Sequence, residues 1–169
     1  CRPRGRLKRR RPESFREDII AMGDNVKISL QSDNEGAIED VEERGTALIR
    51  SAPDSRGDYK QILLANPNQI VIVFSCAQPA PHLRMLDRFL VICERQKIPV
   101  VIAANKVDLV GEDAAKEIFS IYTTLGYRVI YTSPKSGLGI EEFRAVLIDK
   151  LSGLVGPSGV GKSSLLNAV

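Results

Sequence analysis

The glycine-rich segment near the end of the sequence has the residue types of a phosphate-binding loop. It reads Gly156-Pro157-Ser158-Gly159-Val160-Gly161-Lys162-Ser163 and fits the pattern G-x-x-x-x-G-K-S. Glycines let consecutive backbone N–H groups surround phosphate oxygens, the lysine reaches the β- and γ-phosphates, and the serine hydroxyl binds Mg²⁺. We therefore predict a nucleotide phosphate site over these residues and the adjoining Ser164, with Ser163 as the magnesium ligand. The alternative is an ordinary glycine turn before a helix.

Two shorter motifs have the residue types that recognise a base. Asn105-Lys106-Val107-Asp108 and Ser133-Pro134-Lys135 each follow directly after an apolar run. In guanine recognition a carboxylate accepts from the base N1–H and 2-amino group, which adenine lacks, so Asp108 is the candidate base-reading residue. Asn105 can bridge to the base edge and to neighbouring loops, and the Lys106 stem can cover the ring face. Taken alone, each motif also fits a strand end followed by a turn.

Alternating strand and helix patterns must position these motifs. The unbroken apolar run Ile70–Phe74 is typical of a buried parallel strand, and further strands are predicted at Pro99–Ala104, Arg128–Thr132 and Leu154–Val155. Helical spacing predicts helices around Leu83–Cys93, Ala115–Leu125 and Ile140–Leu151, and after the phosphate loop from Lys162. The alternation predicts an α/β domain with a parallel sheet over residues 58–169. Because ligands bind outside the carboxyl ends of parallel strands, we expect the three motifs to meet at one nucleotide.

The first 57 residues have a different pattern, which predicts a small all-β domain. Asn25–Gln31 alternates apolar and polar residues, as a half-buried strand does. Ser51–Asp58 is rich in turn-forming residues and predicts a linker between the two domains. Only about three strands are recognisable, and Cys1 stands where an initiator Met would be, so we expect this domain to be incomplete.

Charge is concentrated in an N-terminal basic arm. Residues 1–16 contain eight Arg or Lys and one acid, whereas the 169-residue chain has a net charge of +3. A basic arm ahead of a mildly acidic remainder indicates a polyanionic partner such as RNA. The alternative is a solvated basic loop.

Composition excludes several classes of protein. The chain is 43% hydrophobic and 27% charged, so it is not disordered as a whole, and no apolar run approaches the roughly 20 residues of a membrane span. Its three cysteines lack paired spacing, which argues against a disulfide framework and for a reducing compartment. We expect Cys76 and Cys93 to fill the core. The only histidine, His82, is expected to cap a helix or face solvent.

The order of the three motifs resembles that of circularly permuted GTPases. Ordinary GTPases place the phosphate loop first, whereas here it follows both base motifs; such a permutation is possible because domain termini often lie close together. Within that class, the β-rich segment ahead of the permuted domain resembles the ribosome-small-subunit-dependent GTPase A family, RsgA or YjeQ. Ser158–Asn167 carries the same resemblance, and so does Gly23–Val26 in the presumed OB-fold.

The resemblance implies an OB-fold-like, RNA-binding domain over residues 1–57 and a circularly permuted GTPase domain over residues 58–169. It implies a cytoplasmic, monomeric factor that binds GTP or GDP with Mg²⁺ and assists late maturation of the small (30S) ribosomal subunit. In that family GTP hydrolysis is slow alone and is stimulated by the small subunit, and the OB-fold contacts ribosomal RNA. No membrane contact is expected.

The resemblance also has departures. The family's switch segments, its Asp-x-Pro-Gly motif and its Cys/His zinc-binding domain would follow residue 169, so catalytic residues and zinc ligands are assigned to no residue here. Pro134 stands where the family usually has Ala, whose backbone N–H donates to guanine O6, and proline has no N–H.

Two other functions remain open at this point. One is an adenine-nucleotide ATPase in which residues 105–108 match by accident. The other is a non-catalytic RNA-binding module with a vestigial nucleotide site.

Overall fold

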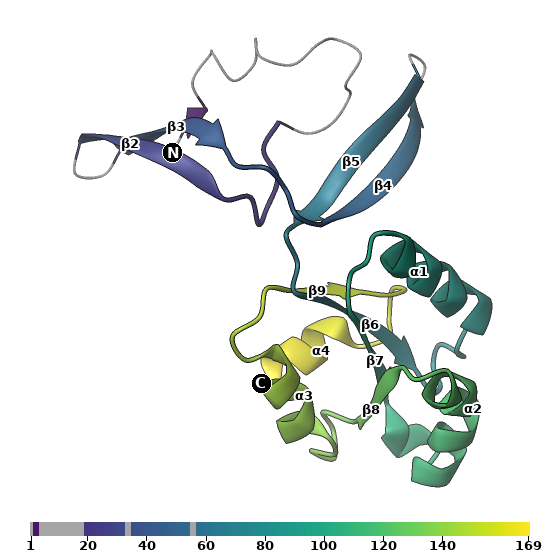
Figure 1. Cartoon of the computed structure of the whole chain (residues 1–169). Coiled ribbons are helices and arrows are strands. Elements are labelled where there is room, and N and C mark those ends of the chain that lie inside the picture. The colour runs from purple at the N-terminus through teal and green to yellow at the C-terminus, as the bar shows by residue number, and fades with distance from the viewer. Residues whose placement is uncertain (1, 4–18, 33–34, 55–56) are drawn as a thin grey trace. The chain divides into compact units, whose positions relative to one another are not determined.

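Four strands form a parallel sheet in the computed structural model of the chain, which describes residues 2–3, 19–32, 35–54 and 57–169 (Figure 1). The strands occur in the order β8 (Arg128–Thr132), β7 (Val100–Asn105), β6 (Gln69–Ser75) and β9 (Ser152–Val155), and every neighbouring pair is parallel. All seven residues of β6 are buried, as expected for a strand covered on both faces. The four predicted strands are confirmed.

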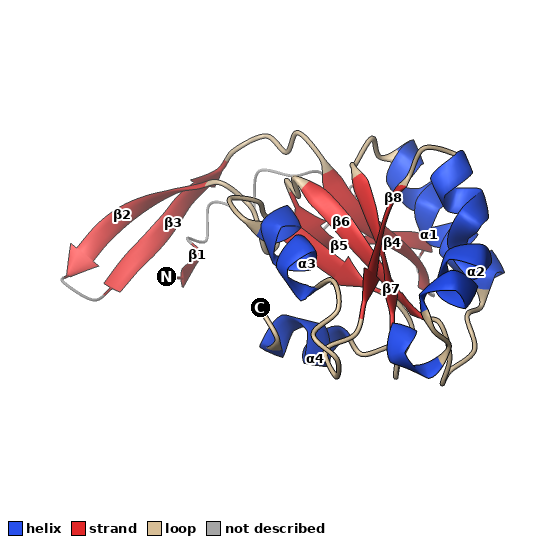
Figure 2. Cartoon of the chain, turned by 90° about the horizontal axis from the view of Figure 1, so that it is seen from below, coloured by secondary structure: helices blue, strands red, loops and turns tan. Residues whose placement is uncertain are grey.

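Helices cover both faces of this sheet (Figure 2). α1 (Leu83–Arg95) and α2 (Glu112–Thr124) lie on one face, and α3 (Ile140–Leu147) and α4 (Lys162–Asn167) lie on the other. On the second face, alternate strand residues pack against both helices in one cluster: Val71, Val73, Val101, Ala103, Ile130, Ile140, Phe143, Val146, Val160 and Leu165. On the first face, the Phe74 ring meets the Phe89 ring of α1 edge-on at 6.4 Å.

The predicted helices are present, but two of them end earlier than expected. Leu125 follows the end of α2 and is 66% exposed, and Leu151 lies four residues beyond α3 and is 41% exposed. His82 caps α1, since its Nδ1 accepts from the Met85 N–H at 3.3 Å, so its predicted capping role is confirmed. Cys76 and Cys93 are buried, as predicted.

The chain divides into two compact units, Cys1–Pro67 and Asn68–Val169, and the elements described in the first unit are β-strands. One sheet orders β1 (Arg2–Pro3), β3 (Glu35–Val41) and β2 (Val26–Ser32). The other is an antiparallel pair, β4 (Ala47–Asp54) and β5 (Gly57–Ala65).

The predicted linker over Ser51–Asp58 is wrong. Ser51–Asp54 belongs to β4 and residues 57–58 to β5, with Ser51 opposite Lys60 and Pro53 opposite Asp58. The boundary expected after residue 57 therefore falls inside a hairpin, and the structure divides the chain after Pro67. Most of the basic arm of residues 1–16 lies outside the described residues.

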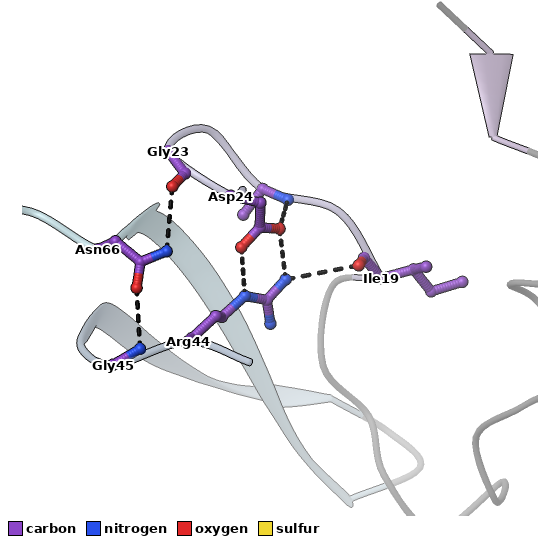
Figure 3. Close-up of polar contacts among 7 residues, drawn as sticks. Ile19, Gly23, Asp24, Arg44, Gly45 and Asn66 are labelled. Atoms are coloured by element: carbon purple, nitrogen blue, oxygen red, sulfur yellow. Dashed lines mark hydrogen bonds and ion pairs between the residues drawn. The ribbon is translucent and has the colours of Figure 1, made fainter. Parts of the chain in front are cut away.

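A buried ion pair ties together the connecting segments of the first unit (Figure 3). Arg44 Nε and Nη2 donate to the two carboxylate oxygens of Asp24 at 2.6 and 2.7 Å, and the Asp24 side chain is 1% exposed. The same carboxylate accepts from the Ala21 N–H at 2.8 Å. Beside it, the Asn66 amide joins the Gly23 carbonyl to the Gly45 N–H. Side chains thus link the turn before β2 to the segments that flank the β4–β5 hairpin.

The described part of the chain has neither a candidate membrane helix nor a candidate metal cluster. Among the residues the structure describes, no helix has the length and apolar character of a membrane span. Within those same residues, no group of three or more His, Cys, Asp or Glu side chains is arranged to hold a metal ion.

We expect Asp24→Asn to destabilise the first unit strongly. The change keeps the shape of the side chain but removes the negative charge from a buried ion pair, and breaking such a pair costs about 3–5 kcal/mol. Hydrogen exchange of residues 19–66 measures the loss, and the exposed Glu43→Gln is the control. Equal exchange in the two variants would contradict the role of the pair.

Candidate functional site

The carboxyl ends of β7, β8 and β9 bring the three sequence motifs to one edge of the sheet. In a parallel sheet these ends point the same way, so the loops that leave them converge. A cavity of about 470 Å³ opens there. It is lined by residues of all three motifs, namely Asn105, Lys106, Asp108, Leu109, Pro134, Lys135, Gly161 and Ser164. The expected meeting of the motifs therefore holds as geometry.

Asn105, the last residue of β7, joins the three loops through its side chain. Its Nδ2 donates to the Val160 carbonyl of the glycine-rich loop at 2.8 Å, and its Oδ1 accepts from the Thr132 hydroxyl at 3.1 Å. Asn105 is 1% exposed and Thr132 is fully buried. The amide therefore holds the end of β8 and the loop after β9 at a fixed separation.

Close packing explains the glycines of the loop. A Cβ on Gly161, at φ +94°, would stand 2.4 Å from Asn105 Nδ2, and a Cβ on Gly156, at φ +148°, would stand 2.2 Å from the Val73 carbonyl oxygen. Any side chain at either position would force the loop away from the strands beneath it.

The Asp108 carboxylate is held in place by the neighbouring motif. The Ser133 hydroxyl donates to Asp108 Oδ1 at 2.7 Å, and the Lys135 ammonium lies 3.8 Å from Asp108 Oδ2. Ser133 is fully buried, whereas Lys135 is mostly exposed, so the serine positions the carboxylate and the lysine adds a solvent-screened charge. The carboxylate borders the cavity with its orientation fixed.

Pro134 lies in a tight turn that leaves a backbone donor available beside it. The Ser133 carbonyl accepts from the N–H groups of Ser136 at 3.2 Å and Gly137 at 2.9 Å, so Pro134 and Lys135 are the two central residues of the turn. Within the described residues, the Lys135 N–H has no hydrogen-bond partner, and Pro134 has no N–H to offer.

The lysine of the glycine-rich loop bonds to carbonyls of the loop itself. Lys162 Nζ donates to the carbonyls of Gly156 at 2.9 Å and Pro157 at 2.6 Å. This places the ammonium across the concave side of the loop, where it can exchange these neutral acceptors for phosphate oxygens. Ser163 is exposed in the first turn of α4, and its hydroxyl has no partner among the described residues. These residues fit a phosphate group and a coordinated Mg²⁺.

The loop between β6 and α1 contributes contacts that the sequence did not reveal. The Lys106 ammonium donates to the Gln78 carbonyl, and the buried Ser75 hydroxyl donates to the Pro79 carbonyl at 2.7 Å. A Cβ on Gly159 would lie 3.6 Å from Pro79 Cδ, so this loop also reaches the glycine-rich loop. Both acceptors are backbone carbonyls, and because every residue has one, the sequence does not indicate these contacts.

The remaining predicted residues form the outer part of the glycine-rich loop. Pro157, Ser158 and Gly159 connect β9 to Val160, which is buried and packs in the core cluster.

Cys76 lies beneath the site, where burial and the nearby Asp108 charge raise the pKa of its thiol to about 11. It is therefore protonated at neutral pH and is no nucleophile.

Comparisons with known proteins agree on one family. The family model described as RsgA GTPase matches residues 41–169. A protein of Alkaliphilus metalliredigens named small ribosomal subunit biogenesis GTPase RsgA is 39% identical over all of this chain and 53% of its own length. The protein of the same name from Moorella thermoacetica is 40% identical over all of this chain and 52% of its own length. The chain thus spans about half the length of the curated relatives it matches.

Solved structures give the same result. The crystal structure of YjeQ from Thermotoga maritima matches with a TM-score of 0.77 and 34% identity, over 98% of this chain and 54% of that one. YloQ, described as a circularly permuted GTPase, matches with a TM-score of 0.62 and 33% identity, over 86% of this chain and 48% of that one. The predicted permuted arrangement of the second unit is confirmed.

We expect Gly161→Ala to damage the site more than Gly126→Ala does. Both glycines have similar φ values, +94° and +89°, but nothing lies within 4 Å of a Cβ on Gly126. Both changes therefore carry the left-handed strain of about 1–2 kcal/mol. Only Gly161→Ala also breaks the Asn105 bond and leaves a buried amide unpaired, which adds about 1–3 kcal/mol.

Denaturant unfolding of the second unit measures the difference. The double variant with Asn105→Ala and Gly161→Ala should lose less free energy of unfolding than the sum of the two single losses. The reason is that Asn105→Ala removes the side chain that the new Cβ at position 161 would clash with. Equal losses for the two glycine variants would show that the contact with Asn105 is unimportant.

Proposed function

Because the chain belongs to the RsgA GTPase family, we propose that it binds GTP and GDP and assists late maturation of the small ribosomal subunit. One observation supports the nucleotide part most directly: the oriented Asp108 carboxylate borders the same cavity as the glycine-rich loop residue Gly161. This arrangement suits one guanine nucleotide, with its base at residues 105–108 and 133–135 and its phosphates at residues 156–164.

Each residue has a distinct task in this proposal. Asp108 accepts from the guanine N1–H and 2-amino group, and the Lys106 stem covers the ring. Lys162 leaves its two carbonyl partners for the β- and γ-phosphates. Ser163 would hold Mg²⁺, which when bound neutralises phosphate charge. Asn105 holds the loops with one N–H of Nδ2 and one lone pair of Oδ1, and its second N–H can donate to the base edge in the cavity.

The assembly role concerns the whole protein, of which this chain spans part. We propose that the first unit is an OB-fold-like domain that contacts ribosomal RNA, and that the protein acts as a cytoplasmic monomer on the small (30S) subunit. GTP hydrolysis stimulated by that subunit, and a zinc-binding domain, are proposed for the whole protein and are assigned to no residue here.

Two alternatives predict different binding. An ATPase would use the glycine-rich loop without base selection, which the fixed Asp108 carboxylate argues against. An RNA-binding module with a vestigial site would not need the Asn105 bonds that hold the loops together.

Co-sedimentation of the chain with purified small subunits tests the assembly role. We expect more binding with a non-hydrolysable GTP analogue than with GDP, and no binding in either state would contradict the proposal.

We expect Asp108→Asn to change which base is bound. The variant loses a charge-assisted hydrogen bond, so GDP affinity should fall by about 1.5–3 kcal/mol, roughly 10- to 150-fold. The affinity of the variant for xanthosine diphosphate should rise, because the 2-oxo group of xanthine accepts a hydrogen bond where the 2-amino group of guanine donates one. Fluorescence titration with both nucleotides measures the change, and Glu112→Gln is the control. Unchanged GDP affinity would exclude Asp108 as the base-reading residue.

Pro134→Ala should sharpen the choice between guanine and adenine. The new N–H can donate to guanine O6, worth roughly 0.5–1.5 kcal/mol, while the lost loop stiffness offsets about 0.4–1 kcal/mol of it. Competition titrations should show the GDP-over-ADP preference rising up to about tenfold, with a smaller change in GDP affinity. If the preference stays the same, the free Lys135 N–H already supplies the donor.

A further inference from the structure

One exposed face of α1 carries a row of arginines. Arg84, Arg88 and Arg95 are spaced i, i+4 and i+11, so they share one face of the helix and extend over about 16 Å of its axis. All three are exposed, and no carboxylate of the described residues forms an ion pair with them. We call these three residues the arginine row. It lies opposite the buried face of α1, made by Leu86, Leu90 and Cys93.

The two acids of the same helix are bonded elsewhere. Asp87 Oδ1 accepts from the Tyr122 hydroxyl of α2 at 2.9 Å, and Glu94 Oε1 accepts from the Tyr127 hydroxyl at 3.1 Å. Burial and these carboxylates raise the pKa of both tyrosines, so the phenols remain donors at neutral pH. The acids thus face the α2 side of the helix and do not neutralise the arginine row.

Charge is unevenly distributed among the helices. α1 has three arginines against two acids, whereas α2 has three acids and one lysine, and α3 has two acids and one arginine. α1 therefore carries a net positive charge and its neighbour α2 a net negative one, side by side on the same face of the sheet (Figure 2). Such segregation concentrates positive potential at the arginine row.

We propose that the arginine row binds the phosphate backbone of RNA. Guanidinium groups donate paired hydrogen bonds to phosphate oxygens, and three of them over about 16 Å span several phosphates of one strand. A membrane surface is disfavoured because the main apolar face of α1 is buried in the core, which leaves only Met85, Val91 and Ile92 of its large apolar side chains exposed to contact lipid. The inference rests on the proposed role at the ribosomal subunit, and it adds a contact on the second unit.

The test compares two variants with the same loss of charge. In the first, Arg84, Arg88 and Arg95 are all changed to Gln; in the control, Lys116, Arg128 and Arg144 are changed to Gln. Binding of a fluorescein-labelled RNA duplex is titrated at several salt concentrations. We expect the first variant to bind at least about tenfold more weakly at about 50 mM salt, with the slope of log K against log salt reduced by about 2–3. The control should change less than threefold.

Further measurements separate the possible outcomes. GDP affinity should be equal in all proteins, which shows that they are folded, and changing the row to Lys should keep most RNA binding. The inference is overturned if the parent does not bind the duplex or if both variants weaken equally. Binding to phosphatidylserine vesicles and to polyglutamate is measured as well. If the first variant keeps its RNA binding but loses binding to the vesicles, the inference is overturned in favour of a membrane. If it loses only binding to polyglutamate, the inference is overturned in favour of an acidic protein. Sedimentation of the parent with small subunits tests the proposed function independently.

Discussion

The pair of hydrogen bonds made by the Asn105 side chain holds the candidate site together. A parallel sheet places its strand ends at one edge but does not fix the loops that leave them. Asn105 does so by donating to the Val160 carbonyl and accepting from the Thr132 hydroxyl. Because the amide is buried, losing either partner would leave a polar group without water, so the arrangement is strongly preferred over looser ones.

The other features of the site follow from this constraint. Gly161 must lack a side chain because Asn105 approaches it closely, and the bond to the Val160 carbonyl holds the loop where the Val160 side chain packs in the core cluster. Ser133 directly follows Thr132, so fixing the end of β8 also places the Ser133 hydroxyl against Asp108. The base-reading and phosphate parts of the site are therefore coupled through one buried side chain. A ligand that orders one loop should also favour the bound form of the other.

Much of this architecture was predictable from the sequence for a simple physical reason. Strands buried on both faces must be apolar throughout, and Ile70–Phe74 is such a run, so β6 could be located within a residue or two. The three motifs act through their side chains, so their residue types indicate the chemistry. The parallel sheet then explains why the motifs lie close together.

The errors arose where structure depends on the backbone. Ser51–Asp58 has the composition of a turn, yet it pairs along most of its length, because a two-stranded hairpin leaves outer edges where Pro53 is tolerated. Gln78 and Pro79 reach the site through carbonyl oxygens, which every residue has. Thr132 could have been predicted, since a hydroxyl at the end of a buried strand beside a motif is a reasonable partner for Asn105.

Competition between GDP and ADP for a fluorescent guanine nucleotide on the unmodified chain tests the central claim most directly. If the strand-end loops form one site in which Asp108 reads the base, GDP should displace the probe and ADP should not compete at concentrations where GDP saturates. Displacement by both nucleotides at similar concentrations would contradict the account, because the phosphate loop would then be acting without the base motifs.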